Sequence, residues 1–196
     1  MYGGSLASGR LTLKEVVCYN KVLKGNIVGM PDKSLSRFKV GAKIVYPSYG
    51  LGVVEKIEQL KMSGNADAFY IIRLRKNGMT VMAPMRSADS IGLRCVINKK
   101  EIPKILAILG NGLMENIEPN WNKRQKLFLE MIKTGALTNV AKVYRALFKL
   151  KESKGLSFIE QQVFDNAYEL IVSEIAESKG IGKDKAAELV GKALEN

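Results

Sequence analysis

The sequence contains no histidine, and this absence excludes a large part of enzyme chemistry. Histidine is the commonest metal ligand and the base of Ser-His-Asp and Cys-His catalytic systems. The two cysteines, Cys18 and Cys95, lie far apart and form no Cys-x-x-Cys pair, so a zinc knuckle is also excluded. Walker A loops, Rossmann glycine triplets and nucleophile elbows are missing as well. We therefore expect a protein that is not an enzyme and that needs no cofactor and no metal.

Long apolar runs are missing too. No stretch reaches the roughly 18 apolar residues that a membrane span requires. The N-terminus lacks the basic, apolar and small-residue regions of a secretory signal. These absences predict a cytoplasmic protein with no membrane contact, and 46% hydrophobic residues predict a folded core.

Acidic residues are too few to balance the basic ones. The formal net charge is +12, and basic proteins of this size typically bind nucleic acid, anionic lipid or the ribosome. Nine basic and two acidic residues lie between Trp121 and Lys154, whereas four basic and eight acidic residues follow from Gly155 to Asn196. Residues 121–154 are therefore the candidate phosphate-binding surface.

Residues 38–97 have the pattern of a small sheet. Asn77-Gly78 predicts a type I′ hairpin, and Ser63-Gly64-Asn65 predicts a second loop. β-branched runs bounded by glycine and proline predict four strands: Lys43–Tyr46, Gly52–Ile57, Phe69–Leu74 and Met79–Ala83. We expect a strongly bent sheet or an SH3-like barrel.

From residue 101 onward the apolar period becomes helical. Glu169, Glu174 and Glu177 are interpreted as a solvated helix face rather than a catalytic set. The pattern predicts one helix with Pro103 in its first turn that stops at Gly110-Asn-Gly112, and a second helix that starts at Trp121. A third helix has Asn139 as its N-cap and stops at Lys154-Gly155. The capping box Ser157-x-x-Glu160 begins a fourth helix, and a last helix runs from Lys183 to Leu194.

The fold class expected is therefore α+β, with a small β barrel followed by an all-α helical bundle. We divide the chain into an N-terminal extension (1–37), a β domain (38–97), a helix with a connector (98–120) and a helical domain (121–196). The extension is expected to be flexible, although Leu11–Tyr19 could form a short helix or strand.

The segment from Trp121 to Lys126 places the only tryptophan beside three cations at a predicted helix start. Because a helix N-terminus favours anions, Lys123, Arg124 and Lys126 at this place indicate phosphate partners. An indole ring can stack on bases or wedge between them. The alternative is that Trp121 anchors the core and the cations are merely solvated.

The chain resembles the CarD/CdnL family of bacterial transcription regulators that bind RNA polymerase, from about Phe38 to Leu194. The resemblance rests on several segments in order: Phe38-Lys-Val-Gly-Ala-Lys-Ile-Val-Tyr-Pro-Ser-Tyr-Gly-Leu-Gly-Val-Val54, Ala83-Pro84, Ser90-Ile-Gly-Leu-Arg94, Asn120-Trp-Asn-Lys-Arg124, Val140-Ala-Lys-Val-Tyr-Arg-Ala-Leu147 and Lys154-Gly-Leu-Ser157.

This resemblance implies that residues 38–97 are a Tudor-like module, shared with transcription-repair coupling factors, that pairs its sheet edge with the polymerase β subunit. It implies that residues 121–196 contact promoter DNA at the upstream edge of the bubble and stabilise the open complex. Carried over, Trp121 is the wedge, and Lys123, Arg124 and Lys126 contact the DNA backbone.

The resemblance leaves some assignments open. Some relatives have arginines where this chain has Leu60 and Met82, so the residues that contact the β subunit are not assigned. Residues 1–37 lie outside the resemblance. We expect a monomer whose own DNA binding is weak and largely independent of sequence, because no recognition-helix pattern is present. The alternatives are an RNA-binding or ribosome-associated basic protein and an enzyme that uses carboxylates.

Overall fold

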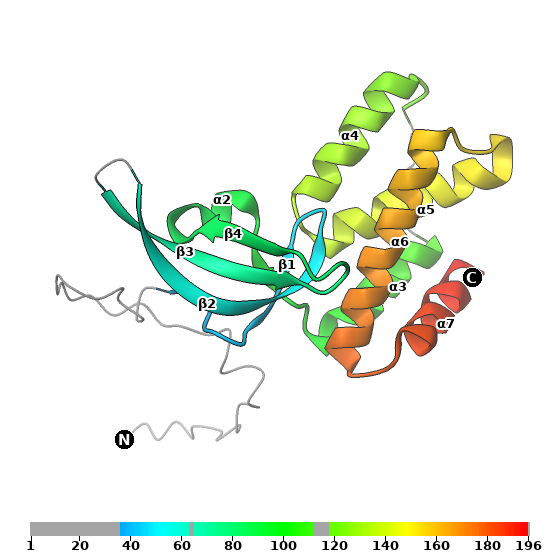
Figure 1. Ribbon diagram of the computed structural model, residues 1–196. Coiled ribbons are helices and arrows are strands. Elements are labelled where there is room, and N and C mark those ends of the chain that lie inside the picture. Colours follow the sequence, from blue (N-terminus) through cyan, green and yellow to red (C-terminus); the bar gives the residue numbers. More distant parts are fainter. Residues whose placement is uncertain (1–35, 63–64, 112–117, 196) are drawn as a thin grey trace, which may run out of the picture.

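The computed structural model describes residues 36–62, 65–111 and 118–195. In these residues an antiparallel five-stranded sheet precedes a bundle of helices (Figure 1). The predicted α+β organisation is confirmed. The predictions for the N-terminal extension, for the Ser63-Gly64 part of the loop and for residues 112–117 lie outside the described residues, except at Ser36 and Arg37.

The sheet has the strand order β4-β3-β2-β1-β5. The long strands β2 (Gly50–Met62) and β3 (Asn65–Leu74) lie at its centre, and a register shift between Val54 and Lys56 bends β2. The other strands are β1 (Lys43–Tyr46), β4 (Thr80–Pro84) and β5 (Arg94–Cys95). The four predicted strands are present, and β2 and β3 extend beyond their predicted bounds.

Two predictions about the sheet were wrong in detail. The described strands do not close into a barrel, because β4 and β5 form the two edges of the sheet. Asn77-Gly78 does not form a type I′ turn, since Gly78 has a positive φ of 69° and Asn77 does not. Instead the Oδ1 atom of Asn77 accepts a hydrogen bond from the Met79 amide, and a longer loop joins β3 to β4.

The short helices η1 (Met85–Ser87) and α2 (Ala88–Ile91) follow β4 and pack against the core of the sheet through Met85, Ala88 and Ile91. Phe38 packs edge-on against Tyr70, and the Tyr70 hydroxyl accepts a hydrogen bond from the Phe38 amide. The β domain therefore has its own core, formed by Phe38, Ala42, Ile44, Val54, Tyr70, Ile72, Leu74, Ala83, Ala88 and Leu93.

The helical part begins with η2 (Lys99–Glu101), which leads directly into α3 (Ile102–Asn111). Then follow α4 (Trp121–Lys133), α5 (Leu137–Lys154), α6 (Phe158–Lys179) and α7 (Lys183–Leu194). Apolar side chains of all five α-helices share one core. Asn139 does not cap α5 as predicted, because the helix starts at Leu137. The side-chain Nδ2 of Asn139 donates instead to the Thr134 hydroxyl. Within the described residues, no helix combines the length and the apolar character needed to cross a bilayer.

The sheet and the bundle are joined by partly buried polar contacts along α6. Arg94 at β5 donates from Nη1 and Nη2 to both carboxylate oxygens of Glu174, with 2.8 Å between Nη2 and Oε2. Glu174 also accepts the Ile97 amide hydrogen, and Arg94 Nε donates to the Gly135 carbonyl at 2.6 Å. The Arg94 guanidinium thus connects the sheet, the loop after α4 and the C-terminal part of α6.

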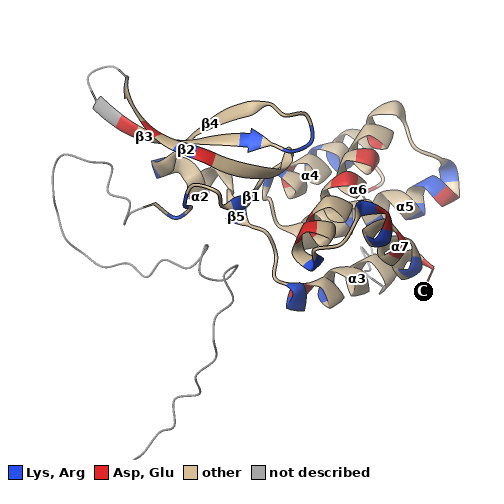
Figure 2. Cartoon of the chain, turned by 60° about the horizontal axis from the view of Figure 1, so that its bottom comes forward, with Lys and Arg blue, Asp and Glu red and all other residues tan. Residues whose placement is uncertain are grey.

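A second group of ion pairs lies beside the first. Glu177 accepts hydrogen bonds from Lys43 of β1 at 2.5 Å and from Arg75 of the β3–β4 loop at 2.6 Å. Figure 2 shows acidic residues along α6 and basic residues on the strands and loop of the sheet. The interpretation of Glu174 and Glu177 as a solvated face was therefore wrong, because they hold the two domains together.

Close backbone packing fixes the same interface. Gly92 and Gly135 have φ values of 82° and 72°, a region that disfavours other residues. A Cβ atom at Gly135 would lie 3.0 Å from the Gly92 carbonyl oxygen and 3.0 Å from Pro47. Glycine is required at both places, because the loops after α2 and α4 touch there.

We expect Glu174→Ala to lower the free energy of unfolding by about 3 kcal/mol, because Arg94 and the Ile97 amide lose their buried acceptor. Urea unfolding measures this change. The exposed Glu188 on α7 supplies the control, since Glu188→Ala should change stability by less than about 0.5 kcal/mol. Equal effects of the two substitutions would contradict a structural role for the Arg94–Glu174 pair.

Candidate functional site

The first turns of α4 and α6 lie side by side at the end of the bundle away from the sheet (Figure 1). The other end of α4 approaches the sheet at Gly135. We call residues 118–126 and 157–160 the tip. It contains every residue that the sequence predicted to bind DNA.

Side-chain caps start both helices of the tip. Asn120 accepts the Lys123 amide hydrogen at 3.1 Å, and its own amide donates to Glu118. Ser157 and Glu160 form the predicted capping box: Ser157 Oγ accepts the Glu160 amide hydrogen, and the Ser157 amide donates to Glu160 Oε2. These caps fix where the two helices begin, and so where the residues of their first turns lie.

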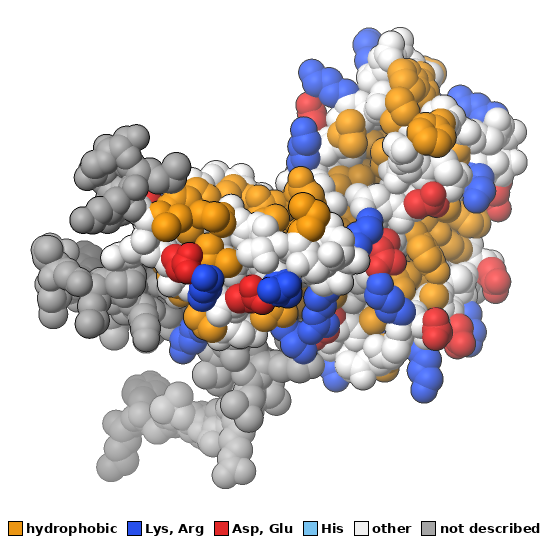
Figure 3. Space-filling view, viewed as in Figure 1, with side chains coloured by type: hydrophobic (Ala, Val, Ile, Leu, Met, Phe, Trp, Pro, Cys, Tyr) orange, Lys and Arg blue, Asp and Glu red, His pale blue; other side chains and the backbone are white. Residues whose placement is uncertain are grey.

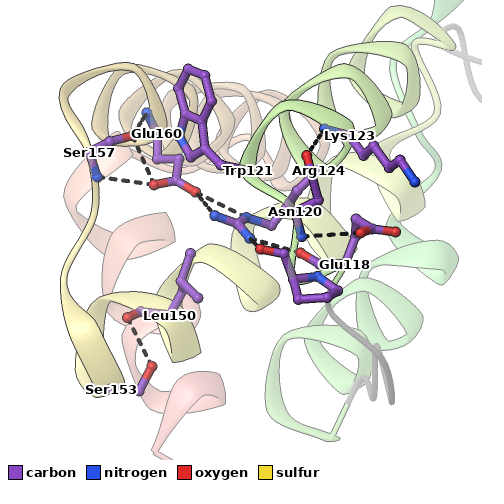
Figure 4. Close-up of polar contacts among 10 residues, drawn as sticks. Glu118, Asn120, Trp121, Lys123, Arg124, Leu150, Ser153, Ser157 and Glu160 are labelled. Carbon is purple, nitrogen blue, oxygen red and sulfur yellow. Dashed lines mark hydrogen bonds and ion pairs between the residues drawn. The ribbon is translucent and has the colours of Figure 1, made fainter.

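Trp121 lies at the surface of the tip with its side chain partly exposed. The residue is 38% exposed, and its indole Nε1–H donates to Ser157 Oγ at 3.2 Å. The same hydroxyl donates to Glu160 Oε2 at 2.8 Å, so the capping box of α6 also orients the indole (Figure 4). Trp121 is therefore held by its polar edge and is not a fully buried core anchor.

Arg124 occupies the interior of the tip. It is 3% exposed, and its Nε and Nη2 atoms donate to Glu160 Oε1 at 3.0 and 2.6 Å. Its Nη1 atom donates to the carbonyls of Glu118 and Pro119. The prediction that Arg124 contacts the DNA backbone does not fit this position, because all three guanidinium nitrogens are engaged inside the protein. Arg124 links α4 to α6.

The carboxylate of Glu160 responds to two opposing effects. Burial by itself raises its pKa, but the hydrogen bonds from Arg124 and Ser157 outweigh burial and hold the pKa of Glu160 below the ordinary value of 4.5. The group therefore stays ionised in the folded protein at neutral pH and balances the charge of Arg124.

Lys123 and Lys126 are the cations that the tip leaves exposed in the first two turns of α4. Figure 4 shows Lys123 pointing away from the Arg124–Glu160 pair. Both ammonium groups can meet phosphates, whereas the buried guanidinium cannot. The tip therefore offers the ring of Trp121 with two exposed lysines nearby on α4.

A second candidate surface is the free edge of the sheet at β4. This strand pairs with β3 on one side, and the order of the described strands leaves its other side open. Met82 in β4 is 50% exposed, and Met79, just before the strand, is 55% exposed. An edge of this kind can accept a strand from another protein.

The sequence located the tip but missed the partners of its residues. The capping-box pattern identified Ser157 and Glu160 as a helix start, yet no local signal connects them to Trp121 and Arg124, which lie 36 residues earlier. Only the packing of α4 against α6 brings these four side chains together.

If Arg124 is structural, Arg124→Ala should lower the free energy of unfolding by about 3–5 kcal/mol, because buried Glu160 is left without its cation. The matched control is Lys126→Ala on the same helix, which should change stability by less than about 0.5 kcal/mol. Chemical denaturation compares the two. An Arg124→Ala protein that is as stable as the parent but binds DNA more weakly would contradict the structural role and support a direct contact between Arg124 and DNA.

The pKa of Glu160 predicts a pH dependence. Since this pKa is depressed on folding, the stabilisation from Glu160 is fully present above its unfolded pKa of about 4.5 and is lost as the pH falls through the folded value. The stability difference between the parent and Glu160→Gln should therefore be largest near pH 7 and shrink below about pH 4. Unfolding measured from pH 7 to pH 3 tests this, and a difference that stays constant over the range would contradict it.

Comparison with known proteins places this geometry in a family. Residues 38–97 match the family described as the CarD-like/TRCF RID domain, and residues 104–191 match the CarD C-terminal domain. The chain is 35% identical over 144 residues to a protein of Bacillus subtilis (strain 168) named "Putative transcription factor YdeB", covering 74% of this chain and 94% of that protein. Both domains of the fold, in the same order, are therefore those of one family. The chain belongs to the CarD-like family of transcription regulators.

Proposed function

We propose that this transcription regulator binds the RNA polymerase β subunit through the β4 edge and promoter DNA at the upstream edge of the bubble through the tip. In this way it stabilises the open complex. The observation that supports the proposal most is Trp121: its N–H is held by Ser157 while its ring lies at the surface, with Lys123 and Lys126 nearby.

The ring of Trp121 favours the open state because stacked bases in a duplex have no free faces. Where the strands separate, an indole can replace part of the lost stacking, which is worth about 1–3 kcal/mol per base. A ligand shifts an equilibrium only by its differential affinity for the two states. Trp121 therefore slows re-annealing without binding the closed duplex tightly.

Lys123 and Lys126 would supply the rest of the DNA contact. Ammonium groups on phosphates release counterions and carry no sequence information. With only Lys123 and Lys126 as exposed cations in the first two turns of α4, the tip would have modest affinity of its own for DNA. Attachment to the polymerase compensates, because it raises the effective concentration of the tip at the promoter.

The β4 edge supports the polymerase contact. β-Augmentation joins a strand of one protein to the open edge of another, and main-chain hydrogen bonds give most of the affinity. Met82 lies in β4 opposite Ile71 of β3 and is half exposed, so it would be covered by such a partner strand.

If β4 is the contact edge, Met82→Asp should weaken binding to the isolated polymerase β subunit by roughly tenfold or more, because a charge enters a desolvated contact. Met79→Asp is the matched control, since Met79 is equally exposed but precedes the strand. Surface plasmon resonance at low salt measures both. Equal affinity of the two variants for the β subunit would argue against the β4 edge as the contact surface. Tight binding of the parent protein to ribosomal RNA without polymerase would favour the RNA-binding alternative.

Trp121→Ala should shorten the lifetime of the open complex by about 5- to 150-fold at most, since base stacking is lost while the β4 edge still binds. Competitor-challenge kinetics on a promoter measure this lifetime. Trp121→Phe keeps a ring without the N–H group and should retain a large part of the effect.

Thermal unfolding of the same two proteins separates stacking from folding. A near-parental melting temperature with a shortened lifetime supports the proposed role. An unchanged lifetime in a stable Trp121→Ala protein, or a loss of folding that accounts for the whole defect, would refute it.

A further inference from the structure

Phe158 is the most exposed large hydrophobic residue in the described part of the chain, at 78% exposure. It is the first residue of α6 and directly follows Ser157, whose hydroxyl accepts the Trp121 N–H. Ile159 follows and is also exposed. Figure 3 shows hydrophobic side chains gathered at this end of the bundle, over the first turns of α4 and α6.

The fold does not account for this ring. Phe158 contributes nothing to the core, and the cap of α6 uses the side chains of Ser157 and Glu160 alone. Ring contacts in the described residues join other aromatic pairs, so the faces of Phe158 and Trp121 are not occupied by each other or by a third ring. Isolated exposed apolar residues are ordinary, but here one exposed aromatic residue is hydrogen-bonded to Ser157 and a second directly follows Ser157 in the chain.

The charges around the tip indicate what could cover it. Lys123, Lys126 and Lys154 are exposed within a few residues of the two rings, and the carboxylate of Glu160 is neutralised by Arg124. The starts of α4 and α6 also place the positive ends of two helix dipoles here. An occupant with flat apolar faces and a negatively charged chain fits this surface, and a nucleic acid strand with unpaired bases has both.

We propose that Phe158 is a second base-contacting residue, so that the tip binds an unpaired base beside the end of a duplex in preference to continuous duplex. The inference rests on the proposed function, since Trp121 is taken as the first contact. In continuous duplex the base faces are stacked and only phosphates remain, which the lysines reach without either ring.

The test uses the full chain without polymerase, at low salt. Two fluorescein-labelled DNAs of matched sequence serve as probes: a continuous duplex, and a fork in which one arm is unpaired. Fluorescence anisotropy should show the parent binding the fork more tightly. Phe158→Ala should weaken fork binding by about 5- to 150-fold and leave duplex binding unchanged. Phe158→Tyr, which keeps a ring, should behave like the parent.

Leu129→Ala is the matched control, since Leu129 is exposed on α4 two turns beyond Trp121 and should affect neither probe. Melting temperatures of all variants should agree, because Phe158 and Leu129 lie at the surface. Parental fork binding by Phe158→Ala, or an equal loss on fork and duplex, would overturn the inference.

The open-complex lifetime distinguishes this failure from failure of the proposed function. If Trp121→Ala shortens the lifetime but Phe158→Ala binds the fork normally, only the inference about Phe158 falls. If Trp121→Ala leaves the lifetime unchanged, both the proposed function and the inference about Phe158 are refuted. Because Trp121 is the only tryptophan, quenching of its fluorescence by unlabelled fork DNA reports directly on the tip.

Discussion

Arg94, which is half-buried, and Glu174, which is buried, form a two-pronged ion pair between the sheet and α6, and the relative position of the two domains depends on it. A buried charge must be fully hydrogen-bonded to be tolerated. Here the carboxylate also accepts the Ile97 amide, and the guanidinium also donates to Gly135. Together with the contact of Gly92 and Gly135, these bonds permit few other arrangements of sheet and bundle. Glu177, bridging Lys43 and Arg75, reinforces the same face.

A fixed joint gives the two candidate surfaces a fixed separation. The β4 edge and the tip belong to different cores, and α4 runs between the joint near Gly135 and the tip at Trp121. When the edge is bound, the tip can sample only a small region of space. In the proposed polymerase complex, that restriction would raise the local concentration of the tip at DNA without any increase in its intrinsic affinity. Under the proposed function, weak and sequence-independent contacts of the tip with DNA would then suffice.

Features with local causes could be predicted from the sequence. The capping box of Ser157 and Glu160, the start of α4 at Trp121 and the last helix from Lys183 to Leu194 each follow from residues within one helical turn or one apolar stripe. Features with distant partners could not. Arg124 lies in a basic segment that is typical of phosphate contacts, and only the packing of α6 against α4 shows that Glu160 neutralises its charge. The spacing of Glu174 along its helix indicates a solvated face, because the sequence does not show that Arg94 of β5 pairs with it. The exposure of Phe158 could not be predicted either, because it depends on which helices pack against the start of α6.

The proposed function requires the tip to reach DNA at the edge of the bubble while the sheet is bound to polymerase. A photo-crosslinking amino acid at the exposed Asn122, beside Trp121, tests it most directly in a promoter complex with polymerase. We expect crosslinks to DNA at the upstream edge of the melted region, formed only when polymerase is present. Crosslinks confined to polymerase subunits, or to duplex DNA far from the bubble, would contradict it.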